Sequence, residues 1–208
     1  MNMKNLLFLL WPLLLTGCNS NAAVKDSAAP IAEAVHLVIP TDTVAYAELD
    51  YNRKTSLWKH KGKLFSGYAL SYYHSGSRKE SISIFNGKQQ NQSFQWYSDG
   101  HLKETAIYHQ GRLHGQKLRW AADTSHRIIA QLNYQGGKAH GEQLIWYPSG
   151  ELFKKLNLNM GREEGIQQAY RKNGALYANY EARDGRIFGL KKAALCFGIE
   201  DENIQYEK

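Results

Sequence analysis

The sequence predicts an all-β fold, an elongated antiparallel sheet of stacked β-hairpin repeats. Its 208 residues include 18 glycines, 13 tyrosines and five tryptophans but four prolines, a composition that favours short strands and turns. Between recurring glycines, apolar and polar residues alternate with the period of two that is typical of strands. These repeat glycines recur every 24 to 26 residues, as Gly62, Gly87, Gly111, Gly137, Gly161 and Gly185.

Residues 1–17 have the pattern of a lipoprotein signal peptide. Lys4 precedes an apolar run over residues 6–15, which is shorter than the roughly 20 residues of a membrane-spanning helix. The run ends in Leu-Thr-Gly-Cys18, which resembles the bacterial lipobox, whose cysteine is lipidated. An ordinary secretory signal would need a small-residue cleavage site, and none adjoins the apolar run.

The expected location follows from Cys18. We expect a protein of the bacterial cell envelope, held to a membrane through the lipid on this residue. Asn19 stands where an aspartate would favour the inner membrane, so the outer membrane is expected, with the protein facing the periplasm or the cell surface.

The rest of the chain divides into four predicted segments. Residues 18–43 are the lipidated cysteine and an alanine-rich flexible tether. Residues 44–61 predict N-terminal capping strands, and residues 62–190 about five hairpin units. Residues 191–208 predict a closing strand around 195–199 and a frayed tail.

Each unit has two turns. The first is a G-[KR]-x-x-G turn, as in Gly137–Gly141, and Asn91 replaces its last glycine in the second unit. The second is a Y-x-x-G turn such as residues 147–150. The third unit has residues 121–126 in its place. Together the turns predict one hairpin per unit.

Apolar residues recur at fixed places in every unit. An aromatic residue stands near the end of each first strand, and apolar residues lie three and five positions before the next repeat glycine. We expect both sets to share one buried face of the sheet. The aromatic set is Tyr72, Trp96, Trp120, Trp146 and Tyr170.

The combined pattern G-K-x-x-G, W-Y-x-x-G-x-L and Y-x-x-G resembles the variant MORN repeat over residues 62–190. Bacterial proteins with this variant are grouped with the YwqK-like antitoxin family. The resemblance implies a β-rich array with interaction roles. An antitoxin-like role rests on it alone and fits poorly with an envelope location, where a cytoplasmic toxin is out of reach.

No enzyme is predicted, because the sequence contains none of the common catalytic, zinc or phosphate-binding motifs; no cofactor is implied. His114 and His140 occupy equivalent places in successive units. They would lie two strands apart, about 9 to 10 Å, which is too far to share one metal ion, so we interpret them as turn residues and predict no metal site.

Two functional hypotheses remain. In the first, the sheet is a scaffold or binding module for an envelope protein or polymer, through tyrosines and lysines on the face opposite the tryptophans. In the second, Cys196, left unpaired once Cys18 is lipidated, handles copper or thiols, although it can equally be a small buried residue. The candidate binding residues are Tyr73, Tyr97, Tyr147, Lys79, Lys103 and Lys155.

The net charge of +7 falls to +6 once Lys4 is removed. This excess suits either an anionic lipid or cell-wall polymer, or simply a solvated basic surface. Nucleic acid is not an expected partner in the envelope.

Overall fold

The computed structural model describes residues 37–190 of the chain. All of them belong to the second of two compact units, His36–Lys208. The predicted signal peptide, Cys18 and most of the tether lie outside the described residues, as do the predicted closing strand and Cys196. No helix in the described part is long and apolar enough to cross a membrane.

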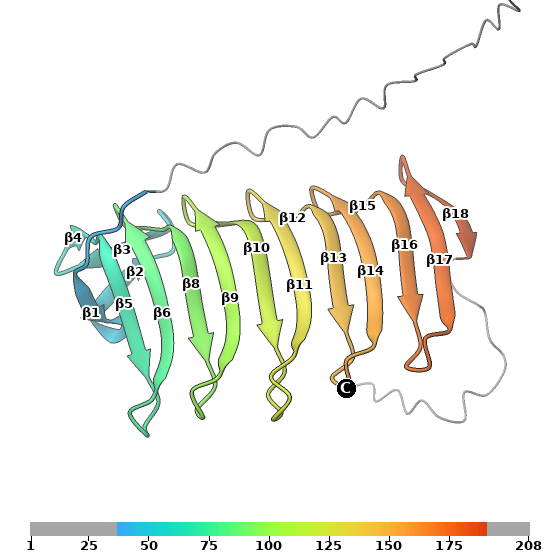
Figure 1. Ribbon diagram of the computed structural model, residues 1–208. Coiled ribbons are helices and arrows are strands. Elements are labelled where there is room, and N and C mark those ends of the chain that lie inside the picture. Colours follow the sequence, from blue (N-terminus) through green and yellow to red (C-terminus); the bar gives the residue numbers. More distant parts are fainter. Residues whose placement is uncertain (1–36, 191–208) are drawn as a thin grey trace, which may run out of the picture. The chain divides into compact units, whose positions relative to one another are not determined.

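The described residues form a large sheet of 15 strands and a small sheet of three (Figure 1). All pairs are antiparallel except that of β1 with β5, which confirms the predicted fold class. The large sheet follows the order β1 (Thr43–Ala45), β5 (Gly67–Tyr72), β6 (Arg78–Phe85), β8 (Asn91–Trp96), β9 (Leu102–His109), β10 (Arg112–Trp120), β11 (Ile128–Gln135), β13 (Gly141–Trp146), β14 (Leu152–Asn159), β16 (Gly165–Tyr170), β17 (Leu176–Arg183) and β18 (Arg186–Leu190). Three two-residue strands pair beside this path, namely β7 (Lys88–Gln89), β12 (Lys138–Ala139) and β15 (Arg162–Glu163).

Each unit contributes two long strands, and its repeat glycine ties it to the unit before. The amide of Gly137 donates to the carbonyl of Leu113 at 2.8 Å, and the amide of Gly161 donates to that of Ala139 at 2.7 Å. Asn91 has a φ of 57°, in the left-handed region that asparagine tolerates better than most residues. The predicted equivalence of Asn91 with the turn glycines is therefore confirmed.

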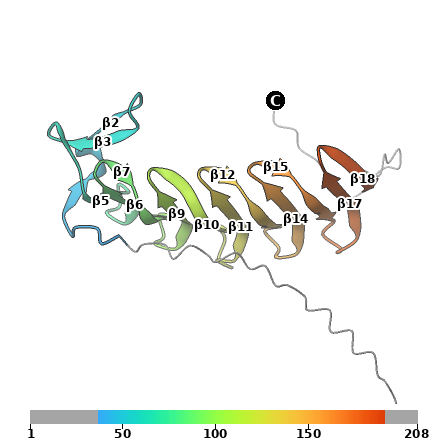
Figure 2. The same ribbon diagram turned by 90° about the horizontal axis from the view of Figure 1, so that it is seen from above.

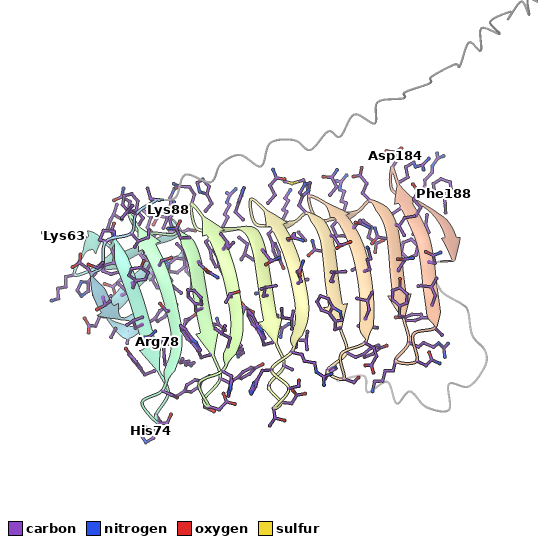
Figure 3. The ribbon with its side chains drawn as sticks, viewed as in Figure 1. Lys63, His74, Arg78, Lys88, Asp184 and Phe188 are labelled. Atoms are coloured by element: carbon purple, nitrogen blue, oxygen red, sulfur yellow. The ribbon has the colours of Figure 1, made fainter. Side chains whose placement is uncertain are left out.

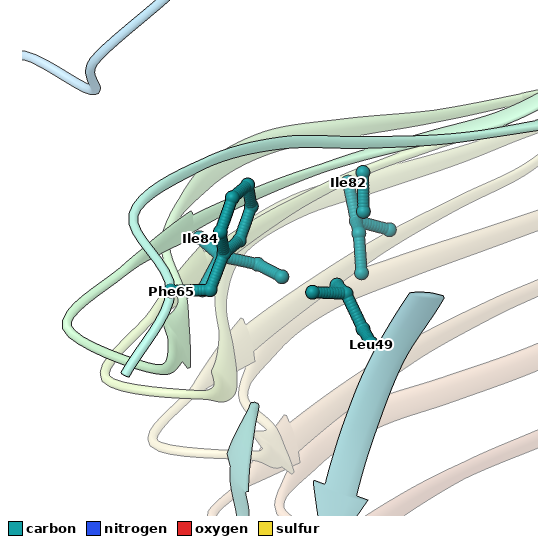
Figure 4. Packing of buried hydrophobic residues seen from close by; sticks show 5 residues of the cluster. Leu49, Phe65, Ile82 and Ile84 are labelled. Atoms are coloured by element: carbon teal, nitrogen blue, oxygen red, sulfur yellow. The ribbon is translucent and has the colours of Figure 1, made fainter. Parts of the chain in front are cut away.

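A small cap lies at the N-terminal end of the sheet. It consists of a 3-10 turn (η1, Tyr46–Glu48) and the strands β2 (Leu49–Asn52), β3 (Leu57–His60) and β4 (Lys63–Leu64). Figure 2 shows β2 and β3 to one side of the row formed by the large sheet. Leu49 from the cap, Phe65, and Ala69, Ile82 and Ile84 from the sheet form the buried core (Figure 4).

The large sheet has two different faces. In the fourth unit, Gln143 pairs with Leu156 and Gly141 with Leu158, so these side chains share a face. Trp146 lies three residues after Gln143 on β13. Because successive side chains of a strand point to opposite faces, Trp146 points to the other face. The prediction that aromatic and aliphatic sets share one face is therefore wrong, because the pairing register set by the hairpin turn places them on opposite sides.

We name the faces by what they carry. The alanine face bears the buried residues Ala69, Ala106, Ala130, Ala169, Ala178 and Ala182. The aromatic face bears Tyr72, Trp96, Trp120, Trp146 and Tyr170.

A β-bulge marks the same place in every unit. The register shifts at the aromatic residue of the first strand, so one extra residue on the second strand is left without a partner. These bulge residues are Lys79, Lys103, Ile129, Phe153 and Tyr177.

Candidate binding face

The three predicted tyrosines fasten one unit to the next. The hydroxyl of Tyr73 donates to the carbonyl of Trp96 at 2.7 Å, and that of Tyr97 to the carbonyl of Trp120 at 2.8 Å. Tyr147 donates to the carbonyl of Tyr170 at 3.0 Å. All three side chains are half-buried at the Y-x-x-G turns. Their hydroxyls are thus engaged within the array, and the rings do not form the freely exposed stripe that the sequence suggested.

Two of the three predicted lysines lie beside these tyrosines. Lys79 and Lys103 are the exposed bulge residues of their units. Their Nζ atoms lie 5.9 Å and 5.8 Å from the ring centres of Tyr73 and Tyr97, within the range of a cation–π contact.

Lys155 belongs to a different row. The equivalent of Lys79 and Lys103 in its unit is Phe153, whose ring centre lies 4.7 Å from that of Tyr147. Lys155 instead binds Glu142 at 2.9 Å. The hydrogen bond that Lys155 donates to Glu142, helped by the negative charge of that carboxylate, raises the pKa of Lys155. The six predicted residues therefore do not form one continuous set.

Exposed apolar side chains gather on the aromatic face. Among the large hydrophobic residues of the long strands, Ile187 is exposed on the alanine face and pairs opposite Ala182. An exposed apolar patch on one face of a sheet usually marks an interaction site. The exposed members on the aromatic face are Tyr72, Ile107, Ile128, Ile166, Leu176 and Phe188.

A line of partner residues across the aromatic face alternates between apolar and polar side chains. The first strands contribute Leu70, Phe94, Leu118 and Leu144. The second strands contribute polar side chains, of which Thr105 is buried, namely Ser81, Thr105, Gln131, Lys155 and Asn179. This mixture was not predicted; it follows from the true register, which the hairpin turns determine.

Cations line the side of the array where the strands end in the repeat-glycine turns; we call this side the edge. Figure 3 shows Lys88 at this end of the strands, Lys63 at the side of the molecule, in the small sheet of the cap, and His74 and Arg78 toward the opposite end. Within residues 37–190 none of the edge cations has an ion pair. One cation follows each repeat glycine: Lys63, Lys88, Arg112, Lys138, Arg162 and Arg186.

A groove of about 830 Å³ lies at the C-terminal end of the same edge. Its lining contains three cationic side chains, Lys138, Arg162 and Arg186, and three anionic ones, Glu163, Glu164 and Asp184. Glu163 accepts a hydrogen bond from Tyr180 at 2.9 Å, and Glu164 accepts one from Asn159 at 2.6 Å. The lining charges balance and part of the groove is already internally bonded, so it selects for no particular charge.

The histidines do not assemble a metal centre in the described part of the chain. No group of three or more histidine, cysteine, aspartate or glutamate residues there is placed to hold a metal ion. His114 lies in β10, where its Nδ1 accepts the amide of Gly136 at 3.4 Å, and His140 lies between β12 and β13. The closest histidine contact is a pair that sequence reasoning did not single out: His101 and His126 stack with ring centres 3.4 Å apart.

No family model matches the chain, and no curated protein matches it. The resemblance to the variant MORN repeat therefore stays an expectation drawn from its motifs.

Proposed function

We propose that this protein is an envelope lipoprotein, anchored through a lipid on Cys18, whose repeat sheet is a binding scaffold for a protein or polymer partner. The observation that supports this proposal best is the one-sided distribution of exposed apolar side chains. Ile128 and Ile166 are 38% and 47% exposed on the aromatic face, while the buried alanines lie on the other. A surface of this kind gains free energy when a partner covers it.

The scaffold is suited to an extended partner. Every unit presents an aromatic residue at the same place, and hydrogen bonds from Tyr73, Tyr97 and Tyr147 hold neighbouring units together. A rigid surface loses little conformational entropy when it binds. The aromatic face, rather than the predicted tyrosine–lysine stripe, is thus the better candidate surface.

The test uses two isoleucines with equal exposure. Ile128 on the aromatic face and Ile187 on the alanine face are each 38% exposed. Each is replaced in the full chain by a photo-reactive benzophenone residue, which couples to any nearby C–H bond, and the cells are illuminated. We expect a discrete cross-linked product from position 128 and none from position 187. Equal coupling at both positions, or none at position 128, would contradict the proposal.

The anchoring part is tested separately. Cys18→Ser should move the protein from the membrane fraction to the soluble fraction of the envelope, and it should abolish labelling by a radioactive fatty acid. Unchanged fractionation and labelling would show that Cys18 is not the attachment site.

A further inference from the structure

The aromatic face repeats in space as regularly as the sequence repeats along the chain. Each unit adds two strands to the sheet, and neighbouring strands lie about 4.7 to 4.9 Å apart. Equivalent aromatic residues, such as Trp96 and Trp120, therefore recur about every 9 to 10 Å. The longer turn of the third unit, residues 121–126, leaves the number of strands per unit unchanged.

We propose that the aromatic face binds a linear β-1,4-linked glycan chain, which lies across the strands with one disaccharide on each unit. This inference rests on the proposed function and names its partner. In such a glycan each sugar is turned over relative to the last, so the same ring face recurs every second sugar. The length of that disaccharide is nearly the step between equivalent strands, so successive units would meet the same chemical groups.

The chemistry of the face also fits sugar rings. A sugar presents C–H groups on its faces, which pack against aromatic and aliphatic side chains, and hydroxyls around its rim. The aromatic row, with Phe94 and Trp96 nearly parallel at 5.7 Å, supplies the packing surface. The neighbouring line of Ser81, Gln131 and Asn179 supplies donors and acceptors, whereas Thr105, at the same place in the second unit, is buried.

The charges of the face favour a neutral polymer over a polyanion. Lys155 is neutralised by Glu142 at 2.9 Å. Arg78, Lys79 and Lys103 of the first two units lie over the rings of Trp96, Tyr73 and Tyr97, and Lys172 of the fifth unit lies over the ring of Tyr147. A polyanion running the length of the sheet would therefore meet no continuous row of cations on this face.

The test titrates soluble hexasaccharides into the full chain in detergent. The probes are the β-1,4-linked hexamers of N-acetylglucosamine and of glucose, with the α-1,4-linked glucose hexamer as control. We expect at least one β-linked hexamer to bind, the matching disaccharide to bind at least tenfold more weakly because it covers a single unit, and the α-linked hexamer not to bind. No binding by either β-linked hexamer, or equal binding by the α-linked one, would overturn the inference.

The tryptophans provide a readout that needs no variant. With 5-fluorotryptophan in the full chain, the fluorine resonances of Trp96, Trp120 and Trp146 should shift on addition of the hexamer, whereas that of Trp58 in the cap should stay. A shift confined to Trp58, or shifts produced only by lipid vesicles or an unrelated peptide, would contradict the glycan assignment.

Substitutions locate the contact. Trp120→Ala should weaken hexamer binding about tenfold, the effect of losing one stacked ring, while Trp120→Phe and Ile187→Ala should stay within a factor of about three. Equal binding by wild type and folded Trp120→Ala would overturn the inference. If the hexamers fail to bind but position 128 still cross-links in cells, the glycan inference is wrong and the scaffold proposal stands.

Discussion

The fifth and third units hold the same hairpin shape by different chemistry. In the fifth, the buried side chain of Gln167 accepts the amide of Asn157 at 3.1 Å and donates to its carbonyl at 2.6 Å. In the third, Lys117 stands in the equivalent place and binds Glu104 at 2.8 Å. The first strand is interrupted before Gly165 in the fifth unit but continues from Arg112 to Trp120 in the third.

The difference shows what the hairpin requires. Side-chain identity at this place on the alanine face is free to vary, provided that the group satisfies a polar neighbour. The buried amide bonds backbone groups directly, including the carbonyls of Glu164 and Gly165 at 3.5 Å and 3.3 Å. The ion pair bonds another side chain and remains partly solvated, so we expect it to contribute less.

The largest effect should come from Gln167→Ala. Gln167 is fully buried. Its loss removes the acceptor of the Asn157 amide and one of the two donors to the Asn157 carbonyl, which still accepts from the amide of Glu164 at 3.0 Å. This should lower the free energy of unfolding by about 2 to 3 kcal/mol. Lys117→Ala should cost about 1 kcal/mol. Chemical denaturation of the full chain measures both, with the exposed Gln116→Ala as control. Equal losses for the two variants would show that amide and ion pair contribute alike.

A second comparison concerns two turn glycines with positive φ. Gly115 in the third unit has a φ of 104°, and Gly141 in the fourth has one of 82°. Alanine at either place should cost about 1 to 2 kcal/mol of backbone strain. A Cβ on Gly115 would lie 3.4 Å from Cδ1 of Ile107, whereas one on Gly141 would lie 3.9 Å from Cβ of Asn133.

Both distances are ordinary van der Waals contacts, so Gly115→Ala and Gly141→Ala should destabilise the fold by similar amounts, through backbone strain alone. Thermal unfolding of the two variants and the wild type measures both losses. A loss at Gly115 that exceeds the loss at Gly141 by more than about 1 kcal/mol would show that packing against Ile107 adds to the strain.

The third unit can be converted to the chemistry of the fifth. Ile107, at the end of the second unit, and Lys117 of the third stand where the fourth and fifth units have Asn157 and Gln167. Ile107→Asn and Lys117→Gln should each destabilise alone, and the double variant should be about 1 kcal/mol more stable than the sum of the two effects. A double-mutant cycle by denaturation measures the coupling. A coupling near zero would mean that the amide arrangement needs the interrupted strand as well.

The smallest effect at neutral pH concerns Tyr180, which lies on the alanine face of the fifth unit. Burial, followed by the hydrogen bond to Glu163, raises the pKa of Tyr180 to about 12, against about 10 in an unfolded chain. The folded state therefore retains a proton that the unfolded state has lost between these values. This contribution is complete below about pH 10 and is lost as the pH rises through about 12.

Between about pH 9 and about pH 12, the free energy of unfolding should fall more for the wild type than for Tyr180→Phe, whose side chain cannot ionise. Burial also raises the pKa of Tyr108 in the second unit, so a residual fall is expected in the variant. Identical falls in both proteins would contradict the role of Tyr180.

The sequence predicted the units and their turns because glycine and asparagine are needed at specific backbone conformations. Asn91 is a direct example, with its φ of 57°. The sequence did not predict which side chains share a face of the sheet. The partners of Leu156 and Trp146 depend on the register of a hairpin, and a turn of one more or one fewer residue reverses every side chain beyond it.

The candidate site was predicted only in its residue types. Tyr97 and Lys103 do lie together, but the hydroxyl of Tyr97 is used by Trp120. Lys155 was grouped with Lys103 although it stands two residues away from the equivalent position, where Phe153 lies. Aligning the second strands by their distance to the next repeat glycine would have separated the two lysines.

The tyrosine hydrogen bonds have a direction, since each runs from a unit to the one that follows. If the array lost its last unit, which begins at Gly161, the hydroxyl of Tyr147 would lose the carbonyl of Tyr170, its acceptor. If it lost its first unit instead, the carbonyl of Trp96 would simply accept from water. The third and fifth units carry no such tyrosine, since Ala121 and Arg171 stand in its place. Removing the last unit therefore takes an acceptor from a tyrosine hydroxyl, whereas removing the first unit does not.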